Sequence, residues 1–160
     1  MKLNVKNETS QLKVVVLGRA ESNGPNPTLD ETFDAKSYET VLNNDFPKEE
    51  NLVNEMTEFE LVLKKYEVEV LRPSLIENVN QVFSRDVGFV IEDEFFVSNI
   101  IPDRAQETAA YLDIKEKFKG NKITYLPENI YVEGGDVLLY NDYIFVGTYN
   151  QPDFKNYKTG

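Results

Sequence analysis

Two stretches of similar pattern, 50 positions apart, restrict the fold of this 160-residue chain more than any other feature. Asp86 stands shortly before the run FVIEDEFFVSN (89–99), and Asp136 begins the run DVLLYNDYIFVG (136–147). Each run contains two β-prone apolar segments joined by a short polar turn, a pattern that predicts a β-hairpin. Similar stretches at this spacing favour a fold that repeats one supersecondary unit.

The segments around the hairpins complete the predicted repeat. We predict strands at Leu12–Gly18, Glu67–Pro73 and Asn121–Pro127, and helices at Lys48–Tyr66 and Asp103–Gly120. The apolar residues at helical spacing are Leu52, Met56, Phe59, Val62 and Leu63 in the first helix, and Ala109, Leu112, Ile114 and Phe118 in the second. The segment Glu21–Phe33 is rich in Asn, Gly and Pro and is predicted to form a long loop.

This order of elements predicts an α/β fold of ββαβ units arranged radially, rather than a doubly wound sheet. One such unit cannot bury its own sheet face, so neighbouring units have to cover it. The chain reaches its end inside a repeat, just after a hairpin. We therefore expect residues 1–160 to form a single partial domain. Its uncovered sheet edge and apolar flank would favour self-association.

The charge and composition exclude several classes of function. The net charge is −11, which argues against nucleic acid and against an anionic membrane surface as partners. The sequence has no cysteine and no histidine, so zinc sites built on them and Cys–His or Ser–His catalytic pairs are excluded. No apolar run approaches the roughly 18 residues of a membrane span, and no signal peptide is visible. These features predict a cytoplasmic protein.

Three carboxylates predict a binding site for a cation. Equivalent positions of a radial fold face one axis, so Asp86 and Asp136 should converge, and Glu133 lies three residues before Asp136 across a Gly-Gly pair. Carboxylates this close repel one another unless a cation joins them. A planar guanidinium matches carboxylates well, because it offers its N–H groups as a fork. A divalent metal such as Mg²⁺ or Ca²⁺ is the rival ligand.

Simpler interpretations of the same residues remain open at this point. The EGGD segment (133–136) could be an ordinary turn, with Asp136 capping it and Glu133 in water. Asp86 could pair with Arg85 or Arg104 at the surface, an arrangement that contributes little stability. The relation of Asp86 to Asp136 by the repeat is what favours a shared site.

Four segments resemble the glycine/arginine amidinotransferase family, in order and over nearly the whole chain. They are LKVVVLGRAES (12–22), NEMTEFELVLKKYEVEVLRP (54–73), VFSRDVGFVIEDEFFVSN (82–99) and EGGDVLLYNDYIFVG (133–147). The EGGD form is also similar to that of arginine deiminases and dimethylarginine hydrolases. The resemblance implies a pentein-type fold, in which five ββαβ units form a propeller around an active site.

The resemblance also implies a chemistry and a set of roles. Family members act on guanidines: a cysteine attacks the guanidinium carbon, and a histidine moves protons. Asp86 and Arg85, the Arg-Asp pair before the first hairpin, would be substrate-binding residues, and Asp86 would hold the guanidinium of an arginine-like substrate. Asp136 would orient the histidine, and Glu133 would be a second acid facing the guanidinium or the histidine. No cofactor and no metal are implied.

This chain departs from the family because the cysteine and the histidine are absent. The resemblance places both in a C-terminal half, so we expect a truncated amidinotransferase-like unit that is inactive alone. The second hypothesis is a non-catalytic module whose acidic pocket binds arginine-like cations or a partner chain. A metal-dependent enzyme built on the three carboxylates is a third.

Overall fold

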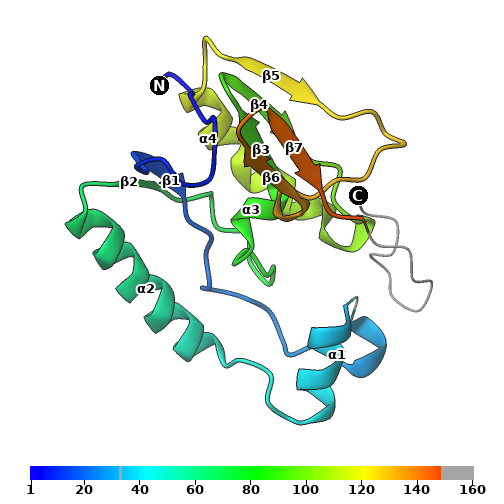
Figure 1. Ribbon diagram of the computed structural model, residues 1–160. Coiled ribbons are helices and arrows are strands. Elements are labelled where there is room, and N and C mark those ends of the chain that lie inside the picture. Colours follow the sequence, from blue (N-terminus) through cyan, green and yellow to red (C-terminus); the bar gives the residue numbers. More distant parts are fainter. Residues whose placement is uncertain (33, 149–160) are drawn as a thin grey trace.

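The computed structural model describes residues 1–32 and 34–148 (Figure 1). The seven strands are β1 (Val14–Val16), β2 (Glu69–Leu71), β3 (Gly88–Ile91), β4 (Glu94–Val97), β5 (Lys122–Tyr125), β6 (Val137–Tyr140) and β7 (Tyr143–Val146). The α-helices are α1 (Ala35–Leu42), α2 (Glu49–Lys65), α3 (Ser84–Val87) and α4 (Leu112–Lys117). The 3₁₀ helices are η1 (Leu29–Glu31), η2 (Pro102–Tyr111) and η3 (Gly134–Asp136).

One complete ββαβ unit lies in the middle of the chain. Strands β3 and β4 form the first predicted hairpin, with Gly88 opposite Val97, and β5 pairs with β4 in parallel after the η2–α4 connection. In the turn between β3 and β4, Glu92 has a φ of 54°. The backbones of Val5 and Glu92 exchange two hydrogen bonds, each N–H donating to the other residue's carbonyl. The prediction of the repeat unit is confirmed here.

The flanking elements reproduce parts of the same unit. Strands β1 and β2 pair in parallel and are connected through α2, as β4 and β5 are connected through η2 and α4. Strands β6 and β7 form the second predicted hairpin, with Val137 opposite Val146. The strands therefore form three small sheets, which fit a mixed α/β fold of repeated units.

The main core lies where the complete unit meets the N-terminal strands. Its buried residues are Leu3, Leu71, Val87, Phe95, Val97, Ala110, Tyr111, Ile114 and Phe118. The rings of Phe95 on β4 and Phe118 after α4 lie 5.0 Å apart, so the helical connection covers one face of this sheet. A second cluster of Leu17, Leu63 and Val68 holds α2 against β1 and β2.

The helix predicted over 103–120 has two different parts. Residues 102–111 form a 3₁₀ helix, and only 112–117 are α-helical. Burial in the first part follows a period of three, through Ile101, Arg104, Glu107 and Ala110. The predicted face was wrong in this part, because Ala109 is exposed and Leu112 is 60% exposed. The predicted positions Ile114 and Phe118 are buried as expected.

Helix α2 matches its predicted limits within one residue at each end, but most of its side chains are not buried. It runs along the outside of the molecule, away from the hairpins (Figure 1). Leu63 is its one buried residue, whereas the predicted inward positions Phe59 and Val62 are about half exposed, at 51% and 49%. Helix α1, whose Asp34 side chain accepts bonds from the backbone of Lys36 and Ser37, was not predicted. Within the described ranges, no helix is both long and apolar enough to cross a membrane.

The outer face of the second hairpin is apolar and exposed. Residues that lie opposite one another in the ladder share a face, and four of them, in two such pairs, are more than half exposed: Leu138 with Phe145, and Tyr140 with Tyr143. Strand β7 pairs with β6 alone among the strands that the structure describes. Within the described residues, the hairpin therefore has the exposed apolar flank that was predicted, while self-association stays a prediction.

We predict that a charge on this face weakens self-association. Phe145→Lys should lower the weight-average mass measured by sedimentation at high protein concentration, because a lysine opposes both apolar docking and strand pairing. Leu42→Lys on α1 is a matched control, since Leu42 is 61% exposed and lies on a different element. Equal masses for wild type and Phe145→Lys at every concentration would contradict the prediction.

Candidate functional site

Asp86 lies on α3, a single helical turn fixed by its neighbours. The Ser84 hydroxyl donates to the carbonyl of Val16 at 2.8 Å, and the Tyr111 hydroxyl donates to the carbonyl of Ser84 at 3.2 Å. Val87 at the end of the turn is buried in the main core. The turn is therefore anchored from β1 and from η2, and Asp86 projects from a rigid support.

The glycines of EGGD allow the next repeat to dock directly on α3. A Cβ at Gly134 would lie 2.1 Å from the carbonyl oxygen of Arg85, and a Cβ at Gly135 would lie 2.7 Å from Oδ1 of Asp86. A side chain at position 134 would overlap the backbone, and a side chain at position 135 would displace the Asp86 carboxylate from its place. The Gly-Gly pair thus brings Glu133 and Asp136 next to Asp86.

Arg85 holds these two elements together. Its Nε donates to the carbonyl of Gly134 at 2.8 Å, and its Nη2 donates to the carbonyl of Val137 at 2.7 Å. Its guanidinium also pairs with Glu8, which accepts a bond from the backbone of Leu139. Substrate binding by Arg85 stays a prediction, and these contacts favour a role in positioning the turn.

The carboxylates of Asp86 and Glu133 meet at the guanidinium of Arg104. Nη1 of Arg104 lies 3.0 Å from Oδ2 of Asp86 and 3.6 Å from Oε1 of Glu133. Nε and Nη2 donate to the two oxygens of Glu107, at 2.7 and 3.0 Å. The alternative pairing of Asp86 with Arg104 is therefore present, but Arg104 is only 9% exposed. Glu133 is largely removed from water, with its side chain 16% exposed.

Asp136 completes the acidic cluster. Its Oδ2 is buried and accepts no hydrogen bond from the described residues. Burial raises the pKa of Asp136, a backbone hydrogen bond opposes that rise, and the charge of Asp86 adds to it. The carbonyl of Asp136 accepts from the backbone N–H of Gly147 at 2.8 Å, which ties the residue to the end of the hairpin. All three predicted acids therefore lie together.

The cluster is electrostatically strained. Burial raises the pKa of Glu133 to about 7, and the charges of Asp86, Asp136 and Glu107 add to this rise while Arg104 opposes it. Burial by itself would lower the pKa of Arg104, but its bonds to Glu107 and Asp86 outweigh that effect and raise it. Arg104 therefore stays charged, and Glu133 changes its charge near neutral pH.

From the sequence, Arg104 was expected only as a surface partner of Asp86, and no role was predicted for Glu107. Both are charged residues at buried positions of a 3₁₀ helix, so a search for apolar periodicity passes over them. The signal that could have found them is the R-x-x-E spacing, because positions i and i+3 eclipse in a 3₁₀ helix. No group of three or more acidic side chains within 1–32 and 34–148 has an arrangement suited to a metal ion.

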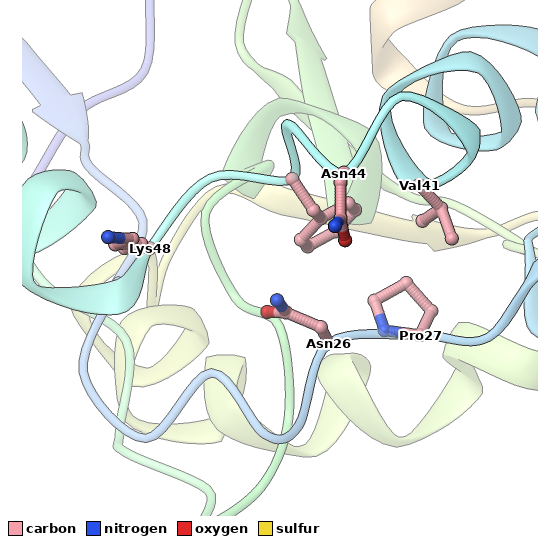
Figure 2. A pocket seen from close by; sticks show the side chains of 6 residues that line it. Asn26, Pro27, Val41, Asn44 and Lys48 are labelled. Atoms are coloured by element: carbon pink, nitrogen blue, oxygen red, sulfur yellow. The ribbon is translucent and has the colours of Figure 1, made fainter.

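A small cavity lies elsewhere, between the predicted loop 21–33 and the segment that joins α1 to α2. Figure 2 shows the lining, which consists of Asn26, Pro27, Val41, Asn44, Phe46 and Lys48, around a volume of about 180 Å³. None of the three acids lines it. The loop therefore forms a hollow separate from the acidic cluster.

Comparison with solved structures identifies the fold. The chain superimposes on SxtG, an amidinotransferase of saxitoxin biosynthesis from Microseira wollei, with a TM-score of 0.69 and 19% identity over 92% of this chain and 55% of that one. The fold is that of the amidinotransferases. The inosamine-phosphate amidinotransferase StrB1 of Streptomyces griseus gives a TM-score of 0.70 with 16% identity, over 89% of this chain and 54% of that one. The resemblance predicted from the sequence is confirmed at the level of the fold.

The amidinotransferase fold is shared with a hydrolytic relative. The N-terminal domain of ArgZ, a cyanobacterial arginine dihydrolase solved with its product, gives a TM-score of 0.65 with 15% identity, over 87% of this chain and 50% of that one. The chain spans about half the length of these structures. By sequence, 94 residues are 35% identical to the uncharacterized protein YkgA of Bacillus subtilis (strain 168), over 57% of this chain and 32% of YkgA. No family model matches.

We predict that Gly134→Ala destabilises this amidinotransferase-like fold by about 2–4 kcal/mol, because the new methyl group would overlap the backbone of Arg85. Gly147→Ala is the matched control, since its Cβ would lie 3.7 Å from the nearest atom, the carbonyl oxygen of Asp136. The measurement is the free energy of unfolding in urea. Similar losses in the two variants would show that close docking of η3 on α3 is not required.

A second prediction concerns pH. Burial raises the pKa of Glu133 to about 7 in the folded protein, whereas the pKa of a free Glu is 4.5. The folded state therefore binds more protons between these values, and folding stability falls as pH rises through this range. Glu133→Gln should remove about 2 kcal/mol of the difference in unfolding free energy between pH 5 and pH 8. The exposed Glu128 gives the control Glu128→Gln. An unchanged pH difference in Glu133→Gln would contradict the prediction.

Proposed function

We propose that this chain supplies the guanidine-binding part of an amidinotransferase-like enzyme that acts on arginine or a related guanidine. The observation that carries the proposal is that Asp86 and Glu133, from consecutive repeats, already lie around one guanidinium, that of Arg104. Acids placed for one planar cation suit a second, because a guanidinium presents donors on several edges. The amidinotransferase fold and the arginine-processing ArgZ support this choice of substrate class.

The proposed roles follow the charges. Asp86 binds the substrate guanidinium, Glu133 is the second acid of the site, and Asp136 orients a catalytic histidine. The chain contains neither histidine nor cysteine, so it lacks the cysteine nucleophile and the histidine of this chemistry and is proposed to be inactive alone. In this proposal its repeats form about half of a five-unit propeller. The cytoplasmic location expected from the sequence is part of the same proposal.

The chemistry explains why acids are needed. The carbon of a guanidinium is a poor electrophile because three nitrogens share the positive charge. Holding those nitrogens on fixed carboxylates orients the carbon for attack and avoids the entropy cost of random encounter. A thiolate then displaces an amine to form an amidino-thioether, and the amidine passes to an acceptor amine or to water. The chain proposed here would provide the orientation and not the attacking sulfur.

Proton release offers a specific signature of binding. A second cation beside Glu133 would stabilise its ionised form and lower its pKa from about 7. Binding at neutral pH should therefore release a fraction of a proton. Asp136, with an unpartnered oxygen among the described groups, lies close enough to contribute.

Calorimetry with arginine, agmatine and Mg²⁺ tests the proposal. We predict binding of arginine or agmatine with proton release at pH 7, seen as a heat that depends on the ionisation enthalpy of the buffer. Asp86→Asn should weaken binding about tenfold or more, because an amide cannot balance the guanidinium charge. Lack of any binding of arginine or agmatine to the wild type, or equal binding by Asp86→Asn, would overturn the proposal.

The second candidate is a non-catalytic module that uses the same acidic cluster. The absence of cysteine and histidine from the sequence favours it if the 160 residues act alone. The two candidates differ in turnover: the first gains amidino-transfer or hydrolysis activity when mixed with a chain that supplies the cysteine and histidine, and the second does not.

A further inference from the structure

We infer that Arg104 is a positioning residue that holds Asp86 and Glu133, from two consecutive repeats, at the fixed spacing needed to bind a guanidinium. The inference deepens the proposed function and rests on it. Arg104 does not itself contact the substrate in this account. It acts through the two carboxylates, and its position is fixed by Glu107.

Glu107 fixes the orientation of the Arg104 guanidinium. Nε and Nη2 of Arg104 meet the two oxygens of Glu107 in a bidentate pair, at 2.7 and 3.0 Å. The 3₁₀ geometry of η2 permits this pair, because side chains at i and i+3 lie directly above one another. Both side chains are more than nine-tenths buried. The guanidinium carbon also lies over the ring of Phe83, 5.9 Å from its centre. The bidentate pair with Glu107 therefore fixes one edge of the guanidinium.

The remaining nitrogen of Arg104, Nη1, contacts the other two acids. With Nε and Nη2 bound to Glu107, Nη1 is directed at Oδ2 of Asp86 and lies 3.6 Å from Glu133. One nitrogen thus links the acid before β3 to the acid before β6. Only Oδ2 of Asp86 accepts this bond, and Oδ1 lies on the side of Gly135. The contact fixes Asp86 without using both of its oxygens.

The negative charges of the acidic cluster outnumber the positive charge of Arg104. Three carboxylates, those of Asp86, Glu107 and Glu133, lie at the guanidinium of Arg104. The charge of Asp136 also acts on Glu133, and the neutral Tyr111 hydroxyl is close by. Arg104 offsets one negative charge, and Glu107 is the acid that it pairs with most closely. The remaining acids keep an excess of negative charge. Arg104 therefore organises the cluster but leaves it attractive to one further cation.

A lysine cannot reproduce this arrangement. An ammonium group is a single point charge with no planar fork, so it cannot pair with Glu107 along one edge while directing another nitrogen at Asp86 and Glu133. Arg104→Lys keeps the charge but loses the spacing of the acids. Arg104→Ala loses both and leaves a space of guanidinium size lined by carboxylates.

The experiment measures the pKa of Glu133 and of Asp86 by carboxyl NMR titration in the full chain. We expect the pKa of Glu133 to rise by at least about half a unit in Arg104→Lys and further in Arg104→Ala, because the nearest opposing charge moves away. Arginine affinity should fall about tenfold in Arg104→Lys. Arg72→Lys is the matched control, since Arg72 is a half-buried arginine paired with Glu21 and Glu60 outside the cluster.

Chemical rescue separates positioning from general stability. Guanidinium chloride at roughly 10 mM, far below denaturing concentrations, should restore the Glu133 pKa in Arg104→Ala, whereas the same concentration of sodium or methylammonium chloride should not. If Arg104→Ala folds only with guanidinium present, that result supports the same inference. Carboxyl pKa values that match the wild type in both variants would overturn it.

The two proposals can fail separately. Failure of the wild type to bind arginine, with carboxyl pKa values that still depend on Arg104, would remove the proposed function and keep the positioning of the acids. Equal arginine binding by wild type and Arg104→Lys would remove the positioning role and keep the proposed function.

Discussion

The buried guanidinium of Arg104 is the contact on which the acidic cluster depends. The carboxylates of Asp86, Glu107 and Glu133 would repel one another strongly in the low dielectric of a protein interior, and the nearby charge of Asp136 would add to this repulsion. Arg104 offsets part of this repulsion. Its planar guanidinium donates two hydrogen bonds to Glu107 along one edge and directs its remaining nitrogen at Asp86 and Glu133. The remaining excess of negative charge costs stability. That cost is consistent with a site that binds a cation, since functional sites often retain strain that the rest of the fold tolerates.

The same cluster joins two repeats, so its geometry depends on how closely they dock. The Gly-Gly pair removes the side chains that would hold η3 away from α3, and Arg85 draws the two elements together through the carbonyls of Gly134 and Val137. The close approach of the Gly-Gly backbone and the hydrogen bonds of Arg85 therefore hold the two repeats together. Glycine is required here for close approach and not for an unusual φ.

Much of the fold could be predicted from the sequence, and the failures have physical causes. The hairpins follow from β-prone apolar runs joined by short polar turns, and α2 follows from apolar residues at helical spacing, so both depend on near neighbours alone. The 3₁₀ helix was missed because its inward positions include Arg104 and Glu107, so its buried face is not apolar. The three acids could be named from the repeat and the family resemblance. Arg104 could be named only as a surface partner of Asp86, because its burial and its contacts with Glu107 and Glu133 depend on tertiary contacts between distant segments.

Hydrogen bonds connect the exposed hairpin, β6 and β7, to the acidic cluster. The backbone N–H of Gly147 donates to Asp136, and Arg85 bonds to Val137 at the start of β6, so the hairpin carries the turn that presents Glu133 and Asp136. The outer face of that hairpin is apolar and uncovered within the described residues. A chain bound to this face would contact the same hairpin whose hydrogen bonds hold Glu133 and Asp136 in place. If such binding changed the position of the hairpin, it would change the site, and ligand binding would by reciprocity change the affinity for that chain.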